Sequence, residues 1–278
     1  MGFIGYQYKK LTGNLIKIDS EELIQEDKDN YKLLGIDFDE GINLIKKIFG
    51  DKFLEETLSF KKNKLSTSSY QFILFAALSQ KFKINKILEI GTYDGKNAFV
   101  LSKIFNKAEI VTVDLPTKDI TKGSFGEAIN SNGLKKHLEI RNKNLLPKNI
   151  TFVESNSFFL PSLDNYKFNN DYDLIFVDGN HIFPEVSWDT FFAYNNLKKN
   201  GKSFLIMDDY LNLNKNNIYN KGRKENNVKV SIVDVFKMCE KLKSITKSNY
   251  ITLLKTHPDK GAKYVYPKKL KSLAIFKF

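Results

Sequence analysis

Three aspartates and one histidine stand where two strands are expected to end. Asp178 closes the apolar run D-L-I-F-V-D, Asp208 and Asp209 close the run F-L-I-M-D-D, and His181 follows Asp178 by three residues. Neighbouring strand axes lie ~5 Å apart, so carboxylates at adjacent strand ends can converge on one ion. Carboxylates are hard oxygen ligands of Mg²⁺, and a bound cation would relieve the repulsion between three uncompensated negative charges. The sequence therefore predicts a divalent-metal site at Asp178, Asp208 and Asp209.

A glycine turn earlier in the chain predicts a ligand-binding crevice. In K-I-L-E-I-G-T-Y-D-G, the apolar run Ile87–Ile90 stops at Gly91, and Gly95 follows four residues later. Residues 96–105 then place their apolar side chains on one face, as a helix does. A strand, a glycine turn and a helix present backbone N–H groups to a nucleotide-like ligand. Gly91 permits close backbone approach, and Gly95 can adopt dihedral angles closed to other residues.

An acid at the end of the next expected strand supports the same class of ligand. Asp114 closes E-I-V-T-V-D, nineteen residues after Gly95. A carboxylate offers two acceptor oxygens to the two hydroxyl groups of a ribose, and dinucleotide enzymes use the same device. Those enzymes also need G-x-G-x-x-G, whereas this chain has G-x-x-x-G. A nicotinamide-dependent dehydrogenase is therefore the weakest alternative.

These motifs resemble a known group of enzymes. The pattern E-x-G-x-x-x-G resembles motif I of the class I S-adenosylmethionine (SAM)-dependent methyltransferases. The runs F-V-D-G-N-H, L-K-K-N-G and F-L-I-M-D-D-Y are similar to the methyltransferase family 24 group. That group includes metal-dependent sugar and natural-product O-methyltransferases and cephalosporin-hydroxylase-like proteins. The resemblance covers about residues 66–278, and its specific motifs lie in 87–95 and 173–210.

The resemblance implies SAM as cofactor, bound at the carboxyl ends of the strands. It also makes Asp178, Asp208 and Asp209 match metal positions. Ser155 and Asn156 follow the expected strand Ile150–Glu154, whose end lies beside the adenine in the family; a plain turn is the alternative. The expected cofactor-binding residues are Glu89, Gly91, Thr92, Tyr93, Asp94, Gly95, Asp114, Ser155, Asn156 and Asp178.

Methyl transfer to oxygen needs an acceptor hydroxyl that loses its proton as it attacks. A metal lowers the pKa of that hydroxyl, and a nearby histidine can take the proton. We expect His181 and Asp178 to be catalytic, with His181 as the base; a structural histidine at a helix start is the alternative. The family's usual D-G-D-H is D-G-N-H here. Asn180 thus replaces an acid that is proposed as the base in some relatives.

The elements expected to position these residues alternate between strand and helix. This order predicts an α/β, Rossmann-like class I methyltransferase fold, with a mostly parallel seven-stranded sheet and an antiparallel edge hairpin. We expect an amino-terminal helical extension or cap over residues 1–65 and a methyltransferase domain over 66–278. Residues 115–149 form a long connection typical of a lid or substrate wall, and we expect His137 within it to be a surface residue.

Composition narrows the class of protein. With 278 residues and 42% hydrophobic residues, the chain can bury a large core. Its single cysteine, Cys239, excludes an internal disulfide framework and a cysteine-based metal cluster, as is typical of the reducing cytoplasm. The amino terminus lacks the apolar core of a signal peptide, and no run approaches the ~18 apolar residues of a membrane span. We expect a cytoplasmic protein without a membrane partner.

The net charge of +12 raises a nucleic-acid hypothesis. However, the lysines are scattered over almost every segment, and only two of the 44 basic residues are arginine, the usual residue for phosphate recognition. The expected partner is a small-molecule acceptor. The aromatic-rich helices fit either a buried core or the interface of a homo-oligomer, and both alternatives stay open.

The sequence thus favours a SAM-dependent, Mg²⁺-assisted O-methyltransferase acting on a sugar, glycoside or related hydroxylated metabolite. One alternative is an RNA or other nucleic-acid methyltransferase, although the fourth strand lacks the [D/N]-P-P-[Y/F] tetrapeptide of amino-directed base methyltransferases. Another is a SAM-binding partner subunit without turnover.

Overall fold

The computed structural model describes residues 16–58, 70–117, 131–163, 171–210, 231–255, 257–258, 260–265 and 271–278. These residues divide into two compact units, one drawn from 1–81 and 208–275 and the other from 82–207 and 276–278. The division crosses strand β6 (Phe204–Tyr210) after Met207 and strand β9 (Ser272–Lys277) after Ile275. The predicted domain boundary at residue 65 stays a prediction.

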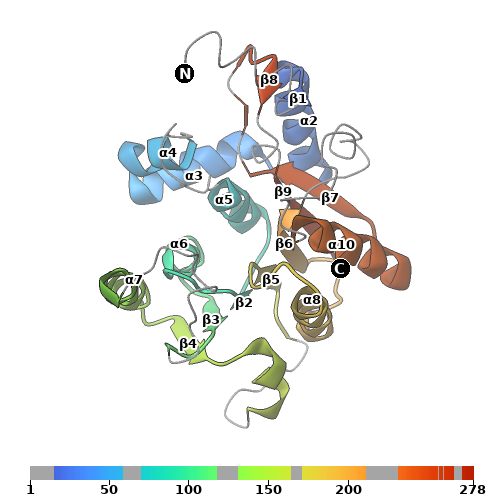
Figure 1. Ribbon diagram of the computed structural model, residues 1–278. Helices are drawn as coiled ribbons and strands as arrows, with labels where there is room; N and C mark the ends of the chain where they lie inside the picture. The colour runs from blue at the N-terminus through green and yellow to red at the C-terminus, as the bar shows by residue number, and fades with distance from the viewer. Residues whose placement is uncertain are drawn as a thin grey trace. The chain divides into compact units, whose positions relative to one another are not determined.

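A seven-stranded sheet has the strand order β4-β3-β2-β5-β6-β9-β7 (Figure 1). Strands β2 to β6 pair in parallel. Ser203 and Phe278 exchange backbone hydrogen bonds, and the Lys255 N–H donates to the Lys271 carbonyl, so β9 runs antiparallel to both neighbours. The Rossmann-like prediction is confirmed. The other strands are β2 (Lys86–Ile90), β3 (Glu109–Asp114), β4 (Ile150–Glu154), β5 (Leu174–Val177) and β7 (Tyr250–Leu254).

The central strands are continuous apolar runs because both of their faces are covered. All four residues of β5 are buried, as are the residues of β2 from Ile87 onward. Figure 1 shows α6 (Lys96–Ile104) and α7 (Ser131–Asn144) on one side of these strands and α8 (Glu185–Asn196) on the other. The strand order reverses between β2 and β5, and the carboxyl ends at such a switch point are where α/β proteins bind ligands.

The other unit is built on a buried helix, α5 (Gln71–Lys81), in which every residue from Phe72 to Leu78 is buried. At Gly41 of α3, an added Cβ would lie 2.5 Å from the carbonyl oxygen of Ile73, so glycine allows α3 to pack directly on the backbone of α5. Besides β7 and most of β9, its described elements include β1 (Ile16–Lys17), α2 (Ser20–Leu33), α3 (Phe38–Phe49), α4 (Asp51–Leu58), α10 (Ser231–Thr246) and β8 (Tyr264–Val265).

Helix α2 covers the edge strand β7. The Asp27 carboxylate accepts the N–H of Leu254 at 2.7 Å, and the Asn30 amide donates to the carbonyl of Thr252 at 3.1 Å. The other oxygen of Asp27 lies 2.7 Å from Nε2 of His257, whose ring stacks on Phe38. Burial raises the pKa of Asp27. Side chains from α2 thus occupy the backbone groups that an exposed edge would offer to another chain.

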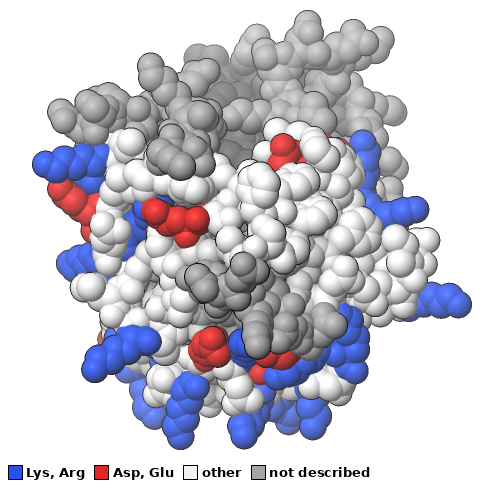
Figure 2. Space-filling view, turned by 90° about the horizontal axis from the view of Figure 1, so that it is seen from below, with Lys and Arg blue, Asp and Glu red and all other residues white. Residues whose placement is uncertain are grey.

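Charge is dispersed on the face that Figure 2 shows. Lys and Arg side chains lie mainly around its rim, and acidic side chains lie among them. This matches the scattering of lysines along the sequence. Among the described helices, none combines the length and the apolar character needed to cross a lipid bilayer.

We expect Asp27→Ala to lower the free energy of unfolding by about 2–4 kcal/mol, because it removes a buried acceptor from both Leu254 and His257. Urea unfolding followed by circular dichroism measures the change. Asp29→Ala on the exposed side of the same helix is the matched control and should leave the midpoint where it is. An unchanged midpoint for Asp27→Ala would mean that this contact does not secure α2.

Candidate active site

The glycine turn between β2 and α6 is closed by the backbone of β5. Gly91 has φ +102, and a Cβ there would lie 2.1 Å from the carbonyl oxygen of Asp178. The Asp178 N–H also donates to the carbonyl of Ile90 at 2.8 Å. Close approach at Gly91 was expected of a ligand, whereas the group that approaches is the protein's own backbone. The contact seats Asp178 directly beside the turn.

Gly95 ends the turn with φ +72 and begins α6. An added Cβ would lie 3.2 Å from Cβ of Asn144 and 3.3 Å from the carbonyl oxygen of Arg141, so glycine meets both demands there, a left-handed backbone and a close neighbour. Within the turn, the Gly95 N–H donates to the Thr92 carbonyl at 2.8 Å, and the Asp94 carboxylate accepts the Lys96 N–H at 2.9 Å. The turn is therefore fixed from inside and from α7.

Asp114 joins the end of β3 to this turn. Its Oδ2 accepts the N–H of Tyr93 at 2.7 Å, and its Oδ1 accepts the N–H of Leu115 at 2.8 Å. Burial raises the pKa of Asp114. A carboxylate has about four acceptor positions, so two remain for the hydroxyls of a ribose. Asp114 therefore positions the turn and can still accept hydrogen bonds from the hydroxyl groups of a sugar.

Glu89 lies behind the turn rather than in the crevice. It is fully buried, accepts the Asn97 amide at 2.6 Å and accepts the hydroxyl of Thr112. Thr112 in turn lies 2.6 Å from the Thr92 hydroxyl. Burial raises the pKa of Glu89 to about 8. The glutamate of the motif thus ties β2, β3 and α6 together, and its role toward a cofactor stays a prediction.

Ser155 and Asn156 follow β4 as expected. The Ser155 N–H donates to the carbonyl of Asp114 at 2.9 Å. Oδ1 of Asn156 accepts the N–H of Phe158 at 3.0 Å and caps the 3₁₀-helix η2 (Ser157–Ser162). Ser155 therefore stands next to Asp114, and a role toward adenine stays a prediction for both residues.

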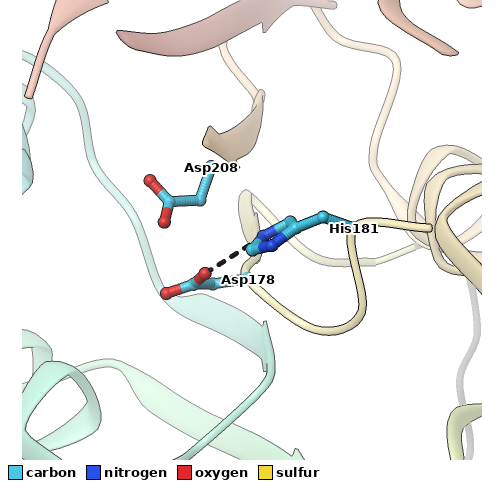
Figure 3. A group of neighbouring side chains, drawn as sticks. All are labelled: Asp178, His181 and Asp208. Carbon is cyan, nitrogen blue, oxygen red and sulfur yellow. Dashed lines mark ion pairs between the residues drawn. The ribbon is translucent and has the colours of Figure 1, made fainter. Parts of the chain in front are cut away.

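Asp178, His181 and Asp208 come together at the end of β5, next to the carboxyl-terminal half of β6 (Figure 3). Nε2 of His181 lies 3.3 Å from Oδ1 of Asp178. Val177 is the register partner of Met207, so the next residue of β6, Asp208, lies beside Asp178, the first residue after β5. One ligand atom from each of the three lies within 4.8 Å of the other two. Two carboxylates and an imidazole are a donor set that suits a divalent cation.

Asp209 faces two lysines. Nζ of Lys255 lies 3.0 Å from Oδ1 of Asp209 and 2.7 Å from Oδ2 of Asp208, and Lys271 pairs with the other oxygen of Asp209. The expectation of uncompensated carboxylates is therefore wrong, because the ammonium groups of Lys255 and Lys271 supply positive charge. Asp209 as a metal ligand stays a prediction, and in this structure His181 completes the group of three.

Sequence reasoning missed three residues of α7 that reach this region. His137 is 8% exposed, so its predicted surface position is wrong, and its ring lies 4.7 Å from that of Tyr93. Arg141 and Asn144 contact the ends of the neighbouring loops. Their spacing of four and then three residues places all three on one helical face, and that spacing was the signal available in the sequence.

Residues 88–210 match the family model of a methyltransferase domain. These residues form a methyltransferase domain. The match spans the glycine turn, Asp114 and the paired strand ends, so the recognition made from the motifs is confirmed. Among curated proteins, none matches the sequence of this chain.

Several solved structures are similar to this chain at low sequence identity. TomG, an O-methyltransferase from Streptomyces achromogenes in complex with SAM, is 17% identical, with 94% of this chain and 98% of that chain covered and a TM-score of 0.48. An O-methyltransferase from Bacillus cereus with S-adenosylhomocysteine (SAH) is 14% identical, with coverages of 85% and 96% and a TM-score of 0.48. The SAH-bound Podospora anserina methyltransferase PaMTH1 is 14% identical, with coverages of 95% and 97% and a TM-score of 0.46. We draw no function from these distant similarities.

Gly91→Ala should unfold or severely destabilise the methyltransferase domain, by about 3 kcal/mol or more, because the new Cβ collides with the Asp178 carbonyl at a positive φ. Gly201→Ala is the matched control, since Gly201 has φ +76 but nothing within 4 Å, and should cost only about 1 kcal/mol. Thermal and urea unfolding compare the two variants. Equal losses would mean that backbone strain alone, and not the contact with β5, makes Gly91 necessary.

Glu89 should make the stability of the domain depend on pH. Its pKa rises from 4.5 to about 8 on folding, so the folded state holds the proton more tightly. Stability relative to Glu89→Gln should therefore be full below about pH 4.5 and fall by roughly 4 kcal/mol as the pH rises to about 8. Urea unfolding of both proteins across this range measures the difference. Parallel profiles would contradict a protonated Glu89.

Proposed function

We propose that this methyltransferase domain is a cytoplasmic, SAM-dependent enzyme that methylates a hydroxyl oxygen of a small acceptor such as a sugar, a glycoside or a related metabolite. The observation that carries the proposal is the Asp178–His181 pair beside the glycine turn. A proton acceptor and a cofactor-binding turn are the two requirements of methyl transfer to a hydroxyl.

His181 is the base in this proposal. The Asp178 carboxylate, 3.3 Å from Nε2, stabilises the imidazolium that forms when the ring takes a proton. Bound SAM would supply the methyl group and, as its sulfonium becomes the neutral thioether of SAH, would keep the electron pair of the broken carbon–sulfur bond. His181 would take the proton of the acceptor hydroxyl, so the positive charge would pass from the sulfonium to the imidazolium. Asn180 beside it is an amide and cannot serve as the base at neutral pH.

The proposal also includes a magnesium ion that assists the reaction. Asp178 and Asp208 would hold the ion with oxygen ligands, with Asp209 as the further predicted ligand and His181 as an alternative. A bound divalent ion would lower the pKa of the acceptor hydroxyl. Lys255 already shares Asp208 and Asp209, so metal binding would have to compete with its ammonium group.

The acceptor is proposed to be small and not a nucleic acid, because the basic side chains are dispersed and acidic groups lie among them. A nucleic-acid substrate would make activity fall steeply with added salt. Flat salt dependence would agree with a small, weakly charged acceptor.

Calorimetric titration with SAH, in Mg²⁺ and again in EDTA, tests the cofactor first. We then expect His181→Gln to lower methyl transfer to a hydroxylated acceptor by roughly 100- to 10,000-fold while the affinity for SAH stays constant, because the variant loses only the proton acceptor. Transfer of a labelled methyl group from SAM to a panel of sugars and glycosides measures this. Lys202→Ala, on an exposed turn, is the control and should keep full activity.

Absence of SAH binding by the folded wild-type protein would refute the proposal as a whole. Full activity of His181→Gln would refute the assignment of the base. If binding and activity are the same in Mg²⁺ and in EDTA, the metal-assisted part of the proposal is refuted, and the assignments of the cofactor and the base still hold.

A further inference from the structure

One face of helix α7 contacts both sides of the candidate cofactor site. His137, Arg141 and Asn144 occupy positions i, i+4 and i+7, which lie one above another on a helix. His137 and Arg141 are buried, whereas Lys135 and Lys136 on the same helix are exposed. The buried polar face is thus turned toward the strands.

Two of these residues hold the glycine turn. Nδ2 of Asn144 donates to the carbonyl of Asp94 at 2.9 Å. The ring of His137 lies 4.7 Å from the ring of Tyr93 and is tilted by 54° against it. Because Asp94 and Tyr93 are the middle of the turn, both contacts act on the segment that Gly91 and Gly95 bend.

Arg141 holds the ends of the next two strands. Its Nη2 donates to Oγ1 of Thr117 at 3.1 Å and to Oε1 of Glu154 at 3.2 Å, and Thr117 donates to the same oxygen of Glu154 at 3.0 Å. Thr117 lies just beyond β3, and Glu154 is the last residue of β4. The guanidinium therefore ties the Asp114 side of the site to the Ser155 side.

The cost of burying Arg141 indicates more than a packing role. Its side chain is 3% exposed, and within the described part of the chain its Nε and Nη1 have no hydrogen-bond acceptor. Leaving such donors unpaired in the interior costs stability, and an apolar side chain of similar volume avoids that cost. A guanidinium at this position is therefore better explained by the two strand ends that it fixes.

We propose that the His137–Arg141–Asn144 face of α7 positions the cofactor site in two halves. This inference rests on the proposed use of SAM. With ribose at Asp114 and adenine at Ser155, the strand order β4-β3-β2 places the amino-acid end of SAM at the glycine turn. Asn144 and His137 thus position the half that meets the amino-acid end, and Arg141 positions the half that meets adenosine.

Two ligands allow the two halves of the cofactor site to be tested separately. SAH has both the adenosine and the amino-acid end, whereas 5′-methylthioadenosine has only the adenosine end. Asn144→Asp keeps the shape of the side chain but removes the donor to Asp94, so we expect SAH to bind about tenfold more weakly and methylthioadenosine to bind as before. Arg141→Lys cannot bridge Thr117 and Glu154 in the same fork, so it should weaken both ligands by a similar factor.

Calorimetric titration of each variant with both ligands makes the measurement, and melting temperatures establish that each variant is folded. Lys136→Ala, on the exposed side of α7, is the matched control and should bind both ligands like the wild type. If Arg141→Lys does not fold, Thr117→Val removes one of its acceptors with a smaller disturbance and should weaken both ligands in the same proportion.

The outcomes distinguish this inference from the proposed function. If the wild type binds neither ligand, the use of SAM is refuted, and the positioning role with it. The second outcome is that the wild type binds both ligands and that the folded Asn144→Asp variant loses affinity for both equally, or for neither. In that case α7 does not divide the site, and the inference is overturned.

Discussion

The contact between Gly91 and the Asp178 carbonyl is the constraint on which the rest of the site depends. With no Cβ at Gly91, the end of β5 closes against the turn after β2, and the Asp178 N–H reaches the Ile90 carbonyl at 2.8 Å. This places Asp178 at the switch in strand order, where ligands of α/β sheets bind. His181 follows on the same loop, so the acid and the imidazole arrive beside the turn together.

Below that contact, buried polar groups tie the strand ends to one another. Glu89 bonds to Asn97 and Thr112, and Asp114 accepts the N–H groups of Tyr93 and Leu115. Removing one member of such a network lowers the stability of the fold, because its hydrogen-bond partner is left unpaired in a low-dielectric interior. The turn is therefore held rigid before any ligand binds, which lowers the ordering cost of binding.

Charge at the ends of β6 and β7 is balanced within the chain. Lys255 bonds to Asp208 and Asp209, and Lys271 bonds to Asp209. These ion pairs offset the negative charge of Asp208 and Asp209, so repulsion between these two carboxylates does not by itself call for a divalent ion.

The sequence by itself determined the alternating elements, the parallel order of the central strands and the residues of the turn, because apolar runs ending in Gly91 or Asp178 reflect local backbone demands. It also placed Asp178 and Asp208 at the ends of two consecutive strands, and the structure shows that these strands are neighbours in the sheet. Only the tertiary structure decided what each side chain contacts. His137 is buried, Asp209 pairs with lysines far along the chain, and Glu89 lies behind the turn, because long-range packing sets burial and ion pairing and leaves no periodic signal in the sequence.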